Sequence, residues 1–206
     1  GKLPAEKFAP GLLKWLAEYG MENKLFDDSI KASRLLLEKV DDPSWKQTAH
    51  GLTGRAYYAK GDKNAASDAY GKALELKANT VYAAESALRL GEIELEKKNP
   101  GVAHDYFEKA ARMSAGEEQL AIRARAYFGL GHSAKLLNDN DKASRYFMSV
   151  AVLYDDELLV PESLYEAASA FFSLHRDEDA GKAVQELKDR YPGSPWVAKA
   201  GSLAKQ

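Results

Sequence analysis

Small residues recur at a nearly constant interval along this chain, and this recurrence constrains the fold more than any other feature of the sequence. Ala66, Ala103, Ala143 and Ala180 each lie at the start of an apolar helical segment, at intervals of 37, 40 and 37 residues. A further step of 37 residues back from Ala66 reaches Ser29, in a segment of the same kind. A fixed period of this length indicates a repeat protein whose units stack on one another.

The clearest unit shows how one repeat would pack. Residues 49–78 predict two helices separated by a turn at Gly61 and Asp62. Apolar residues recur at helical spacing and β-branched runs are nearly absent, which favours an all-α fold. Small residues lie where the two helices approach each other and large ones fill the space between them, namely Gly54, Ala66, Ala73, Tyr57 and Tyr70.

The chemistry of helix ends supports these boundaries. Asn99 before Pro100 places an N-cap residue ahead of a proline at the first helical position. Ser194 before Pro195 repeats the device and predicts a last helix over Trp196–Lys205. Its apolar residues share one face, as expected of a helix that covers the exposed end of a repeat stack. The alternative is that this helix begins a sixth repeat.

The units resemble the tetratricopeptide repeat family, which combines an aromatic residue, Leu-Gly and Tyr in a first helix with Ala, an aromatic residue and Ala in a second. The matching residues are Gly54, Tyr57, Gly61, Ala66, Tyr70 and Ala73 in the second unit, and Tyr127, Leu130, Gly131, Ala143 and Phe147 in the fourth. The period is longer than the family's usual length of about 34 residues, and most closing prolines are missing. This departure leaves the superhelix curvature open.

The resemblance implies an all-α, right-handed α-solenoid of about five helix hairpins with a C-terminal capping helix. We expect a single superhelical domain over residues 1–206. The expected repeats span residues 10–43, 47–79, 84–116, 124–156 and 161–193, and the cap spans 194–206.

The last repeat has a narrower likeness. Its turn Tyr191-Pro192-Gly193-Ser194 resembles the turns that join repeats in bacterial cell-envelope proteins of the barrel-assembly lipoprotein and Tol–Pal coordinator types. Cytoplasmic bacterial proteins use this turn as well. The resemblance therefore leans toward the periplasm or cell envelope over the cytoplasm, and toward a larger bacterial protein.

Composition and motifs argue against most chemical functions. The net charge of −2 gives no long-range field for gathering nucleic acid or anionic lipid, and no apolar run is long enough to span a membrane. No cysteine is present, and the four histidines form no zinc-protease pair. The acidic run Asp155-Asp156-Glu157 lacks the spacing of a calcium loop. We expect no enzyme activity, no cofactor and no metal.

Partner binding is expected on the first helices, which line the concave groove of a stacked array. The packing positions place twelve residues there: Arg55 and Tyr58; Leu88, Glu92 and Leu95; Arg125, Phe128, His132 and Lys135; and Tyr165, Ser169 and Phe172. Aromatic residues flanked by Arg and Lys are typical of binding hot spots. We expect a peptide or helix with apolar anchors and acidic residues for Arg55, Arg125 and Lys135. Alternatively, curvature or longer loops bury some of these residues.

Other partner classes can be judged from the same positions. Repeats of this family that clamp a chaperone's C-terminal carboxylate use Lys and Asn, whereas this chain has Glu18, Arg55, Glu92, His132 and Ser169. A heat-shock-chaperone clamp is therefore not expected. The leading hypothesis is a protein-interaction scaffold. One alternative is a self-assembling structural module that pairs copies through Trp196. Another is a carbohydrate-binding or enzyme-associated module that uses Tyr and Phe as stacking platforms.

Overall fold

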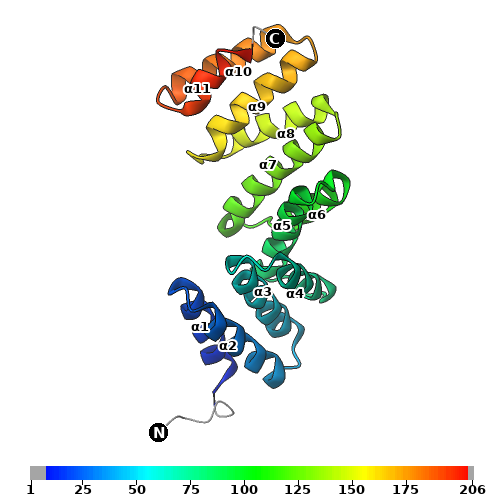
Figure 1. Cartoon of the computed structure of the whole chain (residues 1–206), viewed down its shortest axis with the longest axis vertical. Helices are drawn as coiled ribbons and strands as arrows, with labels where there is room; N and C mark the ends of the chain where they lie inside the picture. The colour runs from blue at the N-terminus through cyan, green and yellow to red at the C-terminus, as the bar shows by residue number, and fades with distance from the viewer. Residues whose placement is uncertain (1–7, 204–206) are drawn as a thin grey trace. The chain divides into compact units, whose positions relative to one another are not determined.

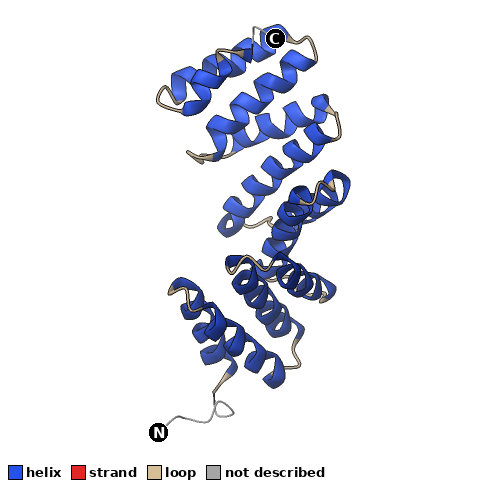
Figure 2. Cartoon of the chain, viewed as in Figure 1, coloured by secondary structure: helices blue, strands red, loops and turns tan. Residues whose placement is uncertain are grey.

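The computed structural model of the chain describes residues 8–203, and these residues form helices joined by turns, with no strand among them (Figures 1 and 2). The helices are α1 (Pro10–Glu22), α2 (Phe26–Lys39), α3 (Pro43–Ala59), α4 (Lys63–Glu75), α5 (Val81–Glu96), α6 (Pro100–Met113), η2 (Glu117–Gln119), α7 (Leu120–Leu136), α8 (Asn140–Leu153), α9 (Leu159–Ser173), α10 (Asp177–Arg190) and α11 (Pro195–Ala200). The predicted all-α fold is confirmed.

The chain forms two compact units, Gly1–Ile93 and Glu94–Gln206. In the first unit α2 packs against α1 and α3, and α4 packs against α3. In the second unit α7 packs against α6 and α8, and α9 packs against α8 and α10. Each unit is thus built from consecutive helices that contact one another, as stacked hairpins require. The expectation of one continuous domain over 1–206 stays a prediction.

A left-handed turn residue ends the first helix of each pair. These residues are Lys24, Gly61, Lys98, Asn138 and His175, with φ between 56° and 82°, and they lie 37, 37, 40 and 37 residues apart. The residue after each one donates its backbone N–H to a carbonyl five residues earlier, as in Leu25 N to Gly20 O at 2.7 Å and Asp139 N to Ala134 O at 2.9 Å. This bond satisfies a carbonyl at the helix end. The turn therefore recurs with the period found in the sequence.

Each of two hairpins closes with an aromatic ring over a glycine. A Cβ atom on Gly54 of α3 would lie 2.5 Å from the Tyr70 ring of α4, and one on Gly131 of α7 would lie 2.6 Å from the Phe147 ring of α8. Both rings are buried. The predicted roles of Gly54 and Tyr70 are confirmed. Tyr57 differs, because its side chain is only half-buried and its hydroxyl accepts a hydrogen bond from Arg34 of α2.

The first helices of the second to fifth repeats begin at Pro43, Val81, Leu120 and Leu159, two to four residues before the expected repeat starts. Pro100 begins α6, but the Asn99 side chain does not cap this helix, because its Nδ2 donates to Glu94 Oε2 at 2.8 Å instead. Ser194 Oγ does cap α11 by accepting from Trp196 N. However, α11 ends at Ala200, earlier than predicted. The predicted end, Lys205, lies outside the described residues.

The C-terminal helix covers apolar surface of the second unit. Ala200 and Leu203 are buried, and Trp196 and Val197 pack against the same cluster, which includes Leu164 of α9. The shared apolar face predicted for this segment is therefore confirmed. These contacts fit a cap, although a sixth repeat would begin in the same way.

The close approach at Gly131 predicts opposite effects for two alanine substitutions in the second unit. Gly131→Ala should lower the free energy of unfolding by about 1–3 kcal/mol, because the new methyl group meets the Phe147 ring. Gly181→Ala, in α10 with no atom within 4 Å of the added Cβ, should raise it by up to about 1 kcal/mol through helix propensity. Urea unfolding of both variants measures the difference. Changes of the same sign in the free energy of unfolding of the two variants would contradict the packing argument.

Candidate partner-binding surface

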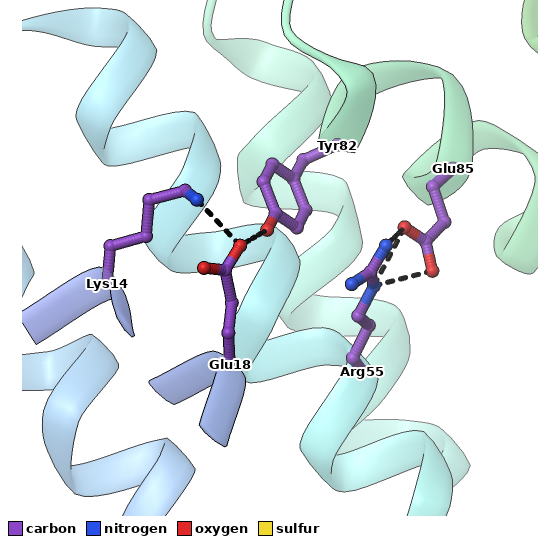
Figure 3. Close-up of polar contacts among 5 residues, drawn as sticks. All are labelled: Lys14, Glu18, Arg55, Tyr82 and Glu85. Carbon is purple, nitrogen blue, oxygen red and sulfur yellow. Dashed lines mark hydrogen bonds and ion pairs between the residues drawn. The ribbon is translucent and has the colours of Figure 1, made fainter. Parts of the chain in front are cut away.

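An ion pair joins two consecutive first helices of the first unit. Arg55 of α3 donates from Nε to both carboxylate oxygens of Glu85 of α5, at 2.7 and 2.8 Å, and its Nη2 contacts the same carboxylate (Figure 3). The Glu85 side chain is only 11% exposed and that of Arg55 is 34% exposed. Burial is the largest effect and disfavours the Arg55 cation, but the hydrogen bonds to Glu85, its negative charge and smaller effects of Tyr82 and Tyr70 together raise the pKa of Arg55. This geometry makes a strong, charge-assisted contact.

A second contact connects α1 to the same group. The Tyr82 hydroxyl of α5 donates to Glu18 Oε1 of α1 at 2.6 Å, and Lys14 Nζ lies 2.7 Å from the same carboxylate (Figure 3). The Arg55 guanidinium lies 4.9 Å from the centre of the Tyr82 ring. Burial opposes ionisation of Glu18, but hydrogen bonds from Lys14 and Tyr82 lower its pKa overall. Side chains of α1, α3 and α5 thus form one polar network.

The other expected residues of the first unit lie beside this network, with one correction. Arg89 of α5 bonds to Glu92 at 2.7 Å and lies 5.2 Å from the centre of the Tyr58 ring. Tyr58 and Glu92 are half-buried, but Leu88 is only 2% exposed and offers no surface to a partner. The equivalent position on α3 is Gly51, where an added Cβ would meet Tyr82. On α3 this position therefore faces the next first helix rather than open groove.

The second unit repeats the ion pair between first helices. Lys135 of α7 bonds to Glu166 of α9, 31 residues further on, whereas Arg55 and Glu85 are 30 residues apart. The Glu166 side chain is 10% exposed. A buried carboxylate on one first helix thus receives a cation from the first helix before it in both units. Arg55 and Lys135 thus already contact carboxylates of this chain, and the expectation that a partner supplies acidic residues for them stays a prediction.

Phe128 and His132 form an aromatic cluster on α7. Their ring centroids are 4.5 Å apart, and the His132 ring lies 5.1 Å from Phe147. Both side chains are half-buried, so part of each remains accessible. Burial lowers the pKa of His132, and the Glu166 carboxylate only partly opposes this effect. The His132 imidazole is therefore neutral at pH 7 and, with the neighbouring rings of Phe128 and Phe147, forms an uncharged aromatic surface.

The remaining expected residues have different environments. Tyr165 of α9 lies 4.9 Å from the Trp196 ring of α11, so the C-terminal helix contacts it. Phe172 is partly buried against the apolar cluster that contains Leu164 and Leu203. Ser169 and Leu95 are also half-buried. Arg125 is exposed on α7. The structure brings together Phe128, His132 and Lys135 on α7, whereas Leu88 is removed from the predicted surface.

Sequence reasoning missed the two buried carboxylates. Glu85 lies in the segment Tyr82–Leu88 and Glu166 in the segment Leu164–Ala170, and most residues of both segments are small or apolar. A lone carboxylate in such a segment signals a buried charge that needs a cation. That signal was present, but the cation lies about 30 residues away on another helix.

The acidic run Asp155-Asp156-Glu157, considered above for metal binding, includes a residue with a structural role. Asp156 accepts hydrogen bonds from Leu158 N and Leu159 N at 2.9 Å, and so caps the start of α9. Within residues 8–203, no group of three or more His, Asp or Glu side chains could hold a metal ion. No helix in the described range is long and apolar enough to cross a membrane.

Comparison with known proteins supports the repeat assignment. The sequence model of the tetratricopeptide repeat matches residues 48–80 and 124–151, which contain most of the hairpins α3/α4 and α7/α8. No curated protein matches the chain by sequence. The resemblance to the tetratricopeptide family is supported for these two hairpins. The narrower likeness to cell-envelope proteins is not confirmed.

Solved structures share the fold. BtubC from P. vanneervenii superimposes with a TM-score of 0.70 at 17% identity, over 86% of this chain and 77% of that one. YrrB, a tetratricopeptide protein with an unusual peptide-binding site, superimposes with a TM-score of 0.70 at 18% identity, over 90% of this chain and 88% of that one. MamA superimposes with a TM-score of 0.68 at 18% identity, over 95% of this chain and 94% of that one. These similarities show that the chain has the all-α repeat-solenoid fold.

The pair Arg55–Glu85 predicts a characteristic double-mutant cycle. Arg55→Met should lower the free energy of unfolding by about 2 kcal/mol, because it leaves the Glu85 charge buried without its cation. Adding Glu85→Gln should recover part of that loss. The control is Lys182→Met in the exposed pair with Glu178, which should leave the free energy of unfolding nearly unchanged because surface ion pairs contribute little. Equal losses in Arg55→Met and the control, measured by urea unfolding, would refute the assignment.

Proposed function

We propose that this chain is a scaffold for protein–protein interaction that binds a peptide or a helix of its partner on the faces of its first helices. The observation that carries the proposal is the surface of α7, where Phe128 and His132 are half-buried beside the Lys135–Glu166 pair. Aromatic side chains held in place next to charged groups are typical of binding hot spots. The fold shared with YrrB, a protein with a peptide-binding site, also supports it.

The internal ion pairs change the partner chemistry that we propose. Arg55 and Lys135 already contact carboxylates, so an acidic residue of a partner would have to compete with Glu85 or Glu166. Apolar anchors on the half-exposed rings require no such exchange. We therefore propose a partner segment whose apolar or aromatic anchors supply most of the affinity, with acidic residues in a minor role.

A non-catalytic role is part of this proposal. Carboxylates on the first-helix faces bond to cations or to a hydroxyl, as Glu18, Glu85 and Glu166 do. Such pairing holds side chains in place and does not poise them for proton transfer.

We also propose a bacterial cell-envelope location. It is supported only by the turn at residues 191–194, in which Ser194 N donates to Tyr191 O at 2.9 Å. Fractionation of cells that express the native gene would test this location.

Peptides selected from a random display library against this protein would test the binding surface. Phe128→Ala should weaken a selected peptide about tenfold or more, as truncation of a hot-spot ring does. Arg145→Ala, on α8 and 74% exposed, is the matched control and should change the affinity by less than about twofold. Circular dichroism would establish that both variants are folded. The peptide's contact site would be mapped by NMR, from the changes in the protein's amide chemical shifts when the peptide is added. Changes confined to the second helices, or an unchanged affinity of the peptide for Phe128→Ala, would refute the proposal.

A second candidate function is self-association through α1. Leu12, Trp15 and Tyr19 of this helix are 43–54% exposed, and the Trp15 and Tyr19 rings stack at 5.3 Å. An exposed apolar patch of this kind favours contact with another protein surface. Trp196 is less suited to that role, because it packs against Tyr165 within its own unit.

Sedimentation over a range of concentrations would test self-association. The native chain should show a mass that rises with concentration, and the double variant Trp15→Ser/Tyr19→Ser should remain monomeric because it loses the apolar contact area. Val152→Ser on α8, 69% exposed, is the control. A native chain that stays monomeric at every concentration would exclude the module as a self-assembling structure.

A further inference from the structure

A pocket of about 230 Å³ lies on the second-helix side of the first unit, away from the ion-pair network. It is formed by α2, α3 and α4, and the proposed partner surface does not use it, although Tyr57 in its lining belongs to the repeat pattern. Its lining residues are Arg34 and Leu37; His50, Thr53 and Tyr57; and Ala65, Asp68, Ala69 and Lys72.

Arg34 has no carboxylate partner among the described residues. Its Nη2 donates to Tyr57 Oη at 3.0 Å, so its hydrogen bond goes to a neutral hydroxyl. Because the Tyr57 oxygen accepts from Arg34, its own proton is directed elsewhere and can be donated to a ligand. The carboxylate that lines the pocket, Asp68, already pairs with Lys72 at 2.7 Å. Within the described part of the chain, the guanidinium is thus the cation of the pocket that lacks a counter-charge.

His50 adds a third group from the middle of the pocket wall. It is half-buried and makes no hydrogen bond or ion pair with any other described residue. Burial lowers its pKa, and the charge of Lys72 acts in the same direction; Asp68 and Glu75 oppose these effects, and Lys46 adds a smaller lowering effect. The ring is therefore neutral at pH 7 when no ligand is present. An anion beside it would favour its protonated form, which donates from both nitrogens.

We propose that this pocket binds a phosphate group, held by Arg34, the Tyr57 hydroxyl and His50. Arg34 comes from α2, and His50 and Tyr57 lie two turns apart on one face of α3, so all three donors line the same pocket. A tetrahedral oxyanion has enough acceptor oxygens for all of them, whereas a carboxylate has two. A guanidinium fork suits phosphate, and its charge-assisted hydrogen bonds are the strong ones. The phosphate could be free or carried on a side chain, and this site does not depend on the partner surface proposed above.

The chain's four histidines make the site measurable by NMR. The imidazole signals would be titrated with pH in chloride and in inorganic phosphate at matched ionic strength. The pKa of His50 should rise in phosphate, whereas the imidazole signals of the other three histidines should be the same in both salts. By linkage, phosphate should bind more tightly as the pH falls through the pKa of His50. Equal shifts for His50 and His175 would show general screening and overturn the proposal.

Two variants isolate the guanidinium. Arg34→Gln should weaken phosphate binding about tenfold, as expected for loss of a charge-assisted hydrogen bond, and Arg34→Lys should fall between it and the native chain. The control is Arg145→Gln, which removes an exposed arginine paired with Asp141 in the second unit. Circular dichroism would show that each variant is folded. Native affinity in Arg34→Gln would overturn the proposal.

Three ligands distinguish the sources of the group. Inorganic phosphate, a short phosphoserine peptide and acetate would be compared by the same His50 signal. Tighter binding of the peptide than of inorganic phosphate supports a phosphorylated side chain, and the reverse order supports a free anion. Acetate binding as tightly as phosphate would contradict the tetrahedral site and overturn the proposal.

Discussion

In the hairpins α3/α4 and α7/α8, the contact on which packing depends is an aromatic ring laid over a residue without a side chain. Where Gly54 meets Tyr70, and where Gly131 meets Phe147, two helix backbones approach more closely than a Cβ atom would permit. This approach commits one side of the first helix to packing. Residues next to these packing positions, Arg55 in one unit and Lys135 in the other, reach the first helix of the following repeat instead.

The ion pairs between first helices fix the positions of these side chains. A buried pair of charges contributes little net stability, because desolvation offsets most of the attraction. Its effect is positional: Glu85 holds Arg55 and Glu166 holds Lys135, so these long side chains lose their freedom before any partner arrives. A surface ordered in advance requires less conformational entropy to be lost on binding. Because the charges of Arg55 and Lys135 are paired within the chain and their side chains are held in place, this surface suits recognition by shape and apolar contact.

The parts of the structure that sequence reasoning predicted depend on local patterns. The period of 37 to 40 residues and the glycine–aromatic pairs are set within one hairpin, where spacing along the chain fixes the contact. The pairings of Arg55 and Lys135 depend on which residue of another helix lies opposite, and local spacing carries no such information. Leu88 was misassigned for the same reason, since its exposure depends on neighbouring helices and not on the pattern of its own helix.

The distribution of paired and unpaired charges separates the two sides of the first unit. On the first-helix side Arg55, Glu85 and Glu18 satisfy one another or a hydroxyl, so an ionic ligand gains little there. On the second-helix side, within the residues that the structure describes, Arg34 bonds only to a neutral hydroxyl, beside a histidine without a partner. An anion gains most where a cation lacks its counter-charge. Analogy to repeat proteins directs attention to the first helices, but the electrostatics of this chain favour an anion on the opposite side.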